Sequence, residues 1–246
     1  MTGANVIRFG SYLPLRRSRQ HRGRASAGGG VTIEPTRSPK IDHRIYDSGR
    51  DPSPSEPGLQ GAQYESARVR LCRLQSADIA ETAELLAKSA DFHKAWVAYP
   101  TDPDEVAGFI EHSPDNGVLI FGIRRRPDNV LVGITTLSRI AYEPWLTAEC
   151  GAAVDVRYRG NGYVAEGMRL LISFAVEHLG FHRIEALVQR ENVRSVRMLE
   201  FAKFRREGTA RGAVRIQGTW VDHIRWAITA EDLAVIQQEI TIAERS

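Results

Sequence analysis

Cysteine and long hydrophobic runs are both scarce in this sequence of 246 residues. No apolar stretch approaches the roughly 20 residues that a helix needs to cross a bilayer, so we expect no membrane partner. Only two cysteines are present, Cys72 and Cys150, and both lie in strand-like apolar surroundings. Two isolated cysteines provide neither a disulfide framework nor a zinc site. We therefore expect two reduced core thiols, no bound metal and a cytoplasmic protein.

Acidic residues are nearly absent from the first 40 positions. This segment holds eight Arg or Lys residues and one acid, Glu34, and so carries about +7. The whole chain carries +3, which leaves about −4 for the remaining residues. The basic character thus belongs to the N-terminal segment, and the alkaline isoelectric point does not indicate a nucleic-acid-binding domain.

Residues 1–66 do not have the pattern of a folded unit. The basic run is followed by Gly28-Gly29-Gly30 and then by a stretch rich in Pro, Ser and Asp. Such a composition buries too little apolar surface to offset the entropy lost on ordering, so we expect a disordered, solvated tail. Three alternatives stay open: a basic arm that contacts RNA or the ribosome, an organelle transit peptide, and an N-terminus assigned too far upstream.

The pattern of a folded domain begins near Arg68. Apolar spacing predicts a strand at 68–73, helices from Ser76 and through 104–110, strands at 118–123, 130–137 and 148–156, a helix from Val164, a strand at 182–188, a helix at 192–201, and strands at 204–207 and 219–228. The turn at 127–129 predicts an antiparallel hairpin, and the helical crossover predicts that 148–156 and 182–188 are parallel. The fold class is α/β, a mixed and mostly antiparallel sheet with one parallel βαβ unit at its centre.

Two glycines precede the helix that begins near Val164. Gly160 and Gly162 allow the backbone to pass close to a ligand. The helix start offers unpaired N–H groups and the positive end of a dipole, which together suit a phosphate. By themselves these residues fit a phosphate-binding loop and an ordinary tight turn equally well.

Four motifs, in this order, resemble those of the GNAT superfamily of N-acetyltransferases. They are Ala148-Glu149-Cys150-Gly151, the run from Arg159-Gly160-Asn161-Gly162 to Glu166, the run from Leu179-Gly180 to Ala186, and Asn192-Val193-Arg194-Ser195 with Met198-Leu199-Glu200 after it. The resemblance covers about residues 68–230 and is closest to the branch that contains the bacterial ribosomal-protein N-terminal acetyltransferases. It implies a GNAT domain at 67–235, whose central strands splay into a V that binds acetyl-CoA, and a C-terminal extension at 236–246.

Three residues depart from the family pattern. Val164 stands where the family usually has alanine, which adds bulk to the loop. Lys203 occupies a glycine position, where a positive φ is required in the family. Leu199 stands where many members have a tyrosine general acid, so the resemblance implies that no tyrosine plays that role at this position.

The resemblance also implies roles for individual residues. The pyrophosphate of acetyl-CoA would be bound by the loop, and the pantetheine arm by main-chain groups and an asparagine; these cofactor-binding residues are Val154, Val156, Arg159, Gly160, Asn161, Gly162, Tyr163, Val164 and Asn192. Glu149 is implied as the general base, and Ser195 as the group that protonates or hydrogen-bonds the departing thiolate.

Purely structural roles remain open for these residues. Glu149 could equally be an exposed strand residue or the partner of an arginine. Asn192 could hydrogen-bond a backbone turn, and Ser195 could hydrogen-bond the backbone of its own helix. Glu185 is the alternative base, although its neighbour Arg183 favours a structural pair. We also expect Trp220 and Trp226 to pack in the final strand.

The leading hypothesis is an acetyl-CoA-dependent N-acetyltransferase in which an amine attacks the thioester directly. The acceptor implied by the resemblance is a protein N-terminus, with a ribosomal protein as the family-level expectation. The alternatives are a small-molecule amine acceptor (an aminoglycoside, a polyamine or an amino acid) and a non-catalytic acetyl-CoA-binding or interaction module. We expect a monomer or a homodimer.

Overall fold

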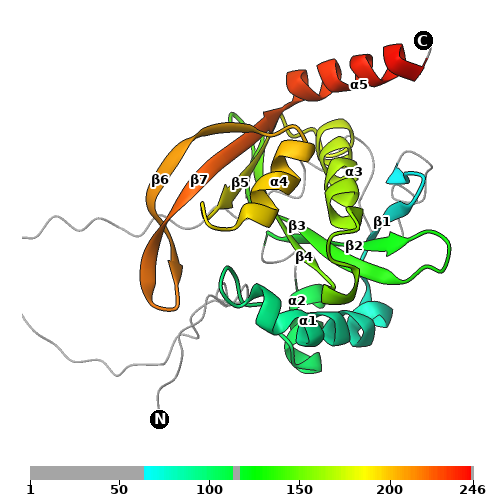
Figure 1. Cartoon of the computed structure of the whole chain (residues 1–246), viewed down its shortest axis with the longest axis vertical. Coiled ribbons are helices and arrows are strands. Elements are labelled where there is room, and N and C mark those ends of the chain that lie inside the picture. The colour runs from blue at the N-terminus through cyan, green and yellow to red at the C-terminus, as the bar shows by residue number, and fades with distance from the viewer. Residues whose placement is uncertain (1–63, 113–116, 245–246) are drawn as a thin grey trace, which may run out of the picture. The chain divides into compact units, whose positions relative to one another are not determined.

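The computed structural model describes residues 64–112 and 117–244. The basic N-terminal segment, and with it the expected tail and its contact with RNA or the ribosome, lies outside the described residues. The described residues form an α/β fold around one mixed sheet of seven strands (Figure 1). Among them, no helix is long and apolar enough to cross a membrane.

The sheet has the spatial order β1-β2-β3-β4-β5-β7-β6. Its strands are β1 (Val69–Arg73), β2 (Leu119–Arg125), β3 (Leu131–Ala141), β4 (Thr147–Val154), β5 (Arg183–Val188), β6 (Arg205–Ile216) and β7 (Thr219–Thr229). β4 and β5 are parallel, and every other neighbouring pair is antiparallel. The predicted hairpin is thus confirmed as β2–β3, and the predicted parallel pair as β4–β5.

Helices cover both faces of this sheet (Figure 1). On one face, α1 (Ile79–His93) and α2 (Pro103–Glu111) pack on strands β2 and β3 and on Ala153 of β4. On the other face, α3 (Tyr163–Glu177) and Leu199 of α4 (Val193–Phe201) pack in the larger core with Ala148 and Cys150. Alternate residues of β4 therefore face opposite helical layers, as expected for a strand covered on both sides.

The last helix, α5 (Ala230–Glu244), follows β7 directly and extends across the expected boundary at residue 235. At the other end of the domain, Tyr64 is buried and its ring makes an edge contact with Phe174 of α3, with centroids 5.1 Å apart. Ordered packing therefore starts before residue 67, where the resemblance placed the domain boundary.

The hairpin β6–β7 is longer than the sequence pattern predicted. β6 has 12 residues instead of the predicted four, and its ladder with β7 contains two bulges. Most β6 side chains are exposed, so this strand lacks the alternation of apolar and polar residues that marks a half-buried strand. Trp226 packs in the core as expected, but Trp220 is 66% exposed near the hairpin tip, because that part of the hairpin extends beyond the core.

Helix α4 ends at Phe201, and Lys203, just beyond its C-cap, has a φ of 66°. The Phe204 N–H donates to the carbonyl of Leu199 at 2.9 Å, and the Lys203 N–H donates to that of Glu200 at 3.0 Å. These two bonds form a Schellman cap, and the buried side chains of Leu199 and Phe204 supply the hydrophobic pair that accompanies it. Lys203 thus adopts the glycine conformation expected from the family pattern.

Both cysteines are free thiols. Cys150 is buried on β4, and burial raises the pKa of its thiol to about 12. Burial also raises the pKa of Cys72. Cys150 is therefore the core thiol that the sequence predicted, whereas Cys72 is only partly buried, and the raised pKa disfavours the thiolate form of both.

Candidate active site

The site begins where β4 and β5 separate. Their parallel ladder covers three residue pairs, Thr147 with Arg183, Ala148 with Ile184 and Glu149 with Glu185. Beyond Glu149, β4 continues to Val154 along β3, whereas β5 continues to Val188 along β7. The two central strands therefore diverge into a V, and the β4 edge that faces β5 becomes available to an extended ligand.

The turn from β4 to α3 lies at the open end of this V. A 3-10 turn, η5 (Val156–Tyr158), follows β4 and leads into Arg159. Gly160 and Gly162 have φ values of 81° and 80°, a region in which glycine carries no steric penalty. A β-carbon at residue 160 would have no atom within 4 Å, so this part of the loop is open to a ligand.

Arg68, next to β1, braces the loop from the side. Its Nε donates to Glu166 at 2.9 Å, its Nη1 donates to the carbonyl of Asn161 at 3.1 Å, and its guanidinium lies 5.2 Å from the ring centre of Tyr163. The guanidinium thus holds both the loop and the first turn of α3. This preserves the free N–H groups of the helix start, which with the helix dipole suit a diphosphate.

Val164 points into the core and not toward the loop opening. It is buried, and its Cγ2 would lie 2.7 Å from a β-carbon placed on Gly133 of β3. Because Gly133 has no side chain, the larger valine fits where the family usually has alanine. The departure at this position is therefore compensated by a residue 31 positions earlier in the chain.

Two main-chain groups implied in pantetheine binding already have partners in this structure. The carbonyl of Val154 bonds the Nε2 of His93 at 3.0 Å, and the N–H of Val156 donates to the hydroxyl of Ser89 at 2.9 Å. Both partners belong to α1. Burial lowers the pKa of His93, which favours a neutral ring that donates this hydrogen bond.

Glu149 and Glu185 lie opposite each other at the last rung before the strands diverge. In a parallel pair, facing residues project to the same side of the sheet. Glu149 accepts a hydrogen bond from Nη1 of Arg139 at 3.2 Å, and Glu185 accepts one from Nε of Arg183 at 2.7 Å. Each carboxylate at the vertex of the V therefore accepts a hydrogen bond from an arginine, and Arg183 also bonds Glu207.

The environment of Glu149 favours its protonated form. Burial raises the pKa of its carboxyl, the charge of Arg139 opposes this, and the nearby Glu185 adds to the rise. Its side chain keeps 25% exposure, so the group is half-buried and reachable from the open side. A half-buried carboxyl with a raised pKa is suited to exchange protons with an amine.

Asn192 and Ser195 are paired with each other at the start of α4. Asn192 is the N-cap, and its side-chain oxygen accepts a hydrogen bond from the N–H of Ser195 at 3.2 Å. This is the turn role that the sequence left open for Asn192. The amide nitrogen of that side chain takes no part in this hydrogen bond. Leu199 is buried in the core, so its position cannot supply a catalytic acid.

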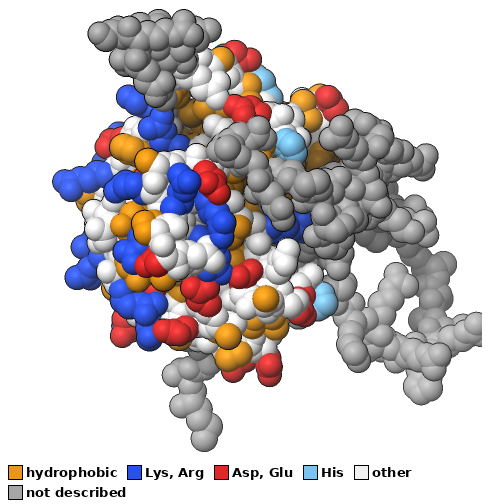
Figure 2. Space-filling view, turned by 90° about the vertical axis from the view of Figure 1, so that its right-hand side faces the viewer, with side chains coloured by type: hydrophobic (Ala, Val, Ile, Leu, Met, Phe, Trp, Pro, Cys, Tyr) orange, Lys and Arg blue, Asp and Glu red, His pale blue; other side chains and the backbone are white. Residues whose placement is uncertain are grey.

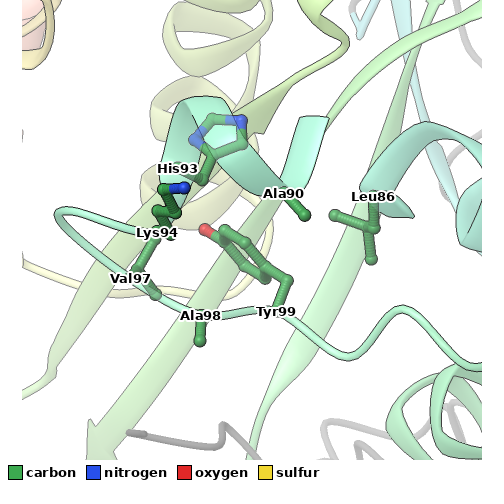
Figure 3. A pocket seen from close by; sticks show the side chains of 7 residues that line it. All are labelled: Leu86, Ala90, His93, Lys94, Val97, Ala98 and Tyr99. Atoms are coloured by element: carbon green, nitrogen blue, oxygen red, sulfur yellow. The ribbon is translucent and has the colours of Figure 1, made fainter. Parts of the chain in front are cut away.

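A small apolar cavity of about 80 Å³ lies between the C-terminal end of α1 and the following loop. Figure 3 shows His93, Tyr99 and Leu86 around it. Ligand pockets occupy about 300–1,000 Å³, so this cavity is too small for a nucleotide-containing ligand. The described residues contain no cluster of three or more His, Cys, Asp or Glu side chains that could hold a metal ion.

The motifs did not identify the residues of the site that come from distant segments. They are Arg68, which precedes β1, and Ser89, Phe92 and His93 of α1, all more than 60 positions before the loop or strand that they contact. The alternation of Arg68 to Arg73 was visible, but nothing local in the sequence indicates which distant group each side chain meets.

Comparison with known proteins agrees with this geometry. The family profile described as "Acetyltransferase (GNAT) domain" matches residues 68–205, which is more than half of the chain. A protein of Bacillus subtilis (strain 168) named "Probable N-acetyltransferase YjcK" is 40% identical over 112 residues, which cover 46% of this chain. That match spans 62% of the Bacillus protein, less than two thirds of its length.

Two further relatives cover more of their own length. The ribosomal protein uS5-alanine N-acetyltransferase of Escherichia coli (strain K12) is 25% identical over 158 residues, which cover 61% of this chain and 81% of the relative. The solved structure of Mycobacterium smegmatis RimJ in complex with CoA-disulfide is 25% identical with a TM-score of 0.60, and covers 67% of this chain and 83% of RimJ. The mixed sheet and its one parallel pair therefore follow a known architecture.

Proposed function

Because this chain belongs to the GNAT family of N-acetyltransferases, we propose that it transfers the acetyl group of acetyl-CoA to the N-terminal amine of a protein. The acceptor class depends chiefly on one observation. Glu149 and Glu185 each bond an arginine, and Glu207, which shares Arg183 with Glu185, also lies near the charge of Arg225. The site therefore does not offer the surplus of negative charge that a polyamine would need. A single amine at the end of a peptide matches this balance better.

The donor would be held along β4 and at the start of α3. The loop from Arg159 to Gly162 and the first turn, with Tyr163 and Val164, would bind the pyrophosphate through main-chain N–H groups. The open edge of β4 near Val154 and Val156 would pair with the pantetheine arm. His93 and Ser89 occupy the carbonyl of Val154 and the N–H of Val156 and so fix the end of the strand; the pantetheine would pair with the main-chain groups of this edge that these two contacts leave available. Asn192 would contribute the amide nitrogen of its side chain.

The acceptor must lose a proton before it can react, because only the neutral amine, and not the ammonium, attacks the thioester. Glu149 would accept one proton from the acceptor, directly or through a water, and release it to solvent. The amine nitrogen then bonds the thioester carbonyl carbon, the carbon–sulfur bond breaks with its electron pair going to sulfur, and the second amine proton compensates the thiolate. Ser195, half-buried in the first turn of α4, would hydrogen-bond the departing sulfur.

The ribosomal relatives support a protein acceptor, and a peptide beginning with alanine is the first one to test. The full chain is incubated with acetyl-CoA and a panel of peptides with free or blocked N-termini, each with an internal lysine, and with spermidine. Release of free CoA and the mass of each product are measured. We expect acetylation only of free N-termini.

Other results would assign a different function. Turnover with spermidine but not with peptides would replace the peptide acceptor by a polyamine. Binding of acetyl-CoA without release of CoA for any acceptor would indicate a non-catalytic module. In cells, loss of N-terminal acetylation from a particular ribosomal protein on deletion of this chain would identify the acceptor.

A further inference from the structure

Two arginines lie at the open end of the V, one on each side. Arg159 follows η5, which continues β4, and Arg194 lies in the first turn of α4, which follows β5. Because β4 and β5 diverge toward these segments, the two residues terminate opposite sides of the cleft. Arg159 belongs to the loop motif, whereas the family motifs attach no role to Arg194.

Both guanidinium groups meet at the same aromatic ring. The guanidinium carbon of Arg159 lies 5.9 Å from the ring centre of Phe92, and that of Arg194 lies 5.1 Å from it. Phe92 is near the end of α1, and the next residue, His93, is hydrogen-bonded to the carbonyl of Val154 at the end of β4. The ring is therefore anchored to the strand end, between the two sides of the cleft.

No ion pair offsets the charges of these two arginines within the part of the chain that the structure describes. Within residues 64–112 and 117–244, neither of them forms an ion pair with an acid. The face that carries β1 and the β2–β3 turn is also rich in basic side chains (Figure 2), but there Arg68, Arg125 and Arg126 each pair with an acid. The positive charge at the cleft end is therefore available to a ligand.

The position of Arg194 is also unfavourable for its own helix. Cations stabilise helices at the C-terminal end and oppose the dipole at the N-terminal end, and the first turn of α4 contains no acid that would offset this. The two positive charges lie against one ring, beside the N-termini of α3 and α4. A multiply charged anion bound between them would offset their mutual repulsion.

We propose that Arg159 and Arg194 form a two-arginine clamp that binds phosphate groups of CoA from both sides of the cleft, and that Phe92 holds the two guanidiniums in position. This assigns a cofactor-binding role to Arg194 and a positioning role to Phe92. It rests on the proposed function only for the identity of the donor. CoA offers a pyrophosphate and a 3′-phosphate, and both are bound best by guanidinium groups.

The test is the affinity of the full chain for CoA, measured by calorimetry without any acceptor. Arg194→Gln is compared with Arg211→Gln, which removes an exposed arginine from the β6–β7 hairpin. Loss of a charge-assisted hydrogen bond should weaken CoA binding about 10-fold or more for Arg194→Gln, and the control should bind like the wild type. Because Arg194 opposes the helix dipole, its variant should unfold at the same or a higher temperature in the absence of CoA.

Binding of 3′-dephospho-CoA shows which phosphate of CoA Arg194 contacts. If Arg194 binds the 3′-phosphate, the loss should disappear when 3′-dephospho-CoA replaces CoA. If Arg194 binds the pyrophosphate, the loss should be the same for both ligands. Either result supports the clamp.

Phe92→Leu keeps an apolar side chain but removes the ring. We expect weaker CoA binding, and in the double variant with Arg194→Gln we expect less than the product of the two single losses, because both act on the same guanidinium. Wild-type affinity of Arg194→Gln for CoA would overturn the clamp, and strict additivity would overturn the role of Phe92. Because no acceptor is present, neither result depends on whether the acceptor is a peptide.

Discussion

Glu149 and Glu185 show how two similar residues acquire different environments at one rung of the sheet. Glu185 is bonded to Arg183 at 2.7 Å, and Arg183 also pairs with Glu207, so this carboxylate belongs to a charge network across β5 and β6. Glu149 has a longer contact of 3.2 Å with Arg139, and burial raises its pKa. The raised pKa and the single, longer arginine contact favour Glu149 as the proton acceptor.

We predict that Glu149→Gln lowers kcat about 10²- to 10⁴-fold, the usual contribution of a general base, and leaves the affinity for CoA unchanged. Because burial penalises the charged form of Glu149, the neutral variant should be at least as stable as the wild type. Steady-state kinetics, calorimetry and thermal unfolding measure the three quantities. Glu185→Gln is the matched control, and an equal loss of kcat in both variants would contradict the assignment of the base to Glu149.

The raised pKa of Glu149 also has a consequence for the pH profile. Only the deprotonated carboxylate accepts a proton, so kcat should fall as the pH decreases through the pKa of Glu149. Because burial raises that pKa, the fall should occur above the ordinary glutamate pKa of about 4.3. The acidic limb of the profile should be absent from the residual activity of Glu149→Gln, and an unchanged limb in that variant would assign it to another group.

The elements that carry the site are joined by turns that contain residues with positive φ angles. Substitutions at these residues should change the free energy of unfolding. At the end of α4, Lys203 adopts a φ of 66° in a Schellman cap whose other features are all present. At the start of α3, Gly162 has a φ of 80° and Gly180, beyond the other end of the same helix, has a φ of 71°.

Replacing Lys203 by glycine should stabilise the protein, because a residue with a β-carbon in the left-handed region costs about 1–2 kcal/mol. The gain in the free energy of unfolding would be measured by urea denaturation. Lys203→Ala removes the same side chain but keeps the β-carbon, and so should not reproduce the gain. Equal stability of the two variants would mean that the backbone relaxes at this position.

We predict that Gly162→Glu abolishes acetyl-CoA binding and leaves the protein folded. The new carboxylate would lie at the start of α3, where a β-carbon is 3.4 Å from Arg68, and would repel the pyrophosphate. Gly180→Glu imposes a similar backbone strain at the opposite end of α3, in open space. This control should lose similar stability but retain acetyl-CoA binding, which a thermal-shift titration would detect.

At the scale of the whole domain, the hydrophobic core includes residues that precede the first strand. Tyr64 is 1% exposed and lies in the larger core with Phe121 and Phe174, ahead of the first strand. Three aromatic rings thus meet under β2 and α3, with centroid distances of 5.1 Å and 5.3 Å for the two contacts of Phe174.

We predict that a chain starting at residue 61 keeps the stability and CoA affinity of the full chain, whereas one starting at residue 67 is destabilised by about 3–5 kcal/mol, the usual cost of removing a buried aromatic side chain. Denaturant unfolding of the two truncated chains measures the difference. Tyr64→Ala in the full chain should reproduce the loss, and if it does not, the segment contributes through other residues.

Much of the fold followed from local sequence. The β2–β3 hairpin, the parallel β4–β5 pair, the glycine loop and the left-handed position at Lys203 were all predicted, because each depends on residues within a few positions or on the handedness of one crossover. The length of β6 and the exposure of Trp220 were not predicted, because a solvated hairpin has no apolar alternation.

The amino-acid order alone was enough to indicate the sheet and the loop, since spacing within short segments determines turns, caps and strand direction, and the resemblance of its motifs indicated the family. The partners of those motifs depended on the folded chain: Arg68 on the loop, Ser89 and His93 on the end of β4, and Phe92 between Arg159 and Arg194. Residues far apart in sequence meet only after the helices pack on the sheet, so no periodicity records which of them will touch. The same packing gives Glu149 and Glu185 different charged partners, because a neighbouring charge is a property of the tertiary structure.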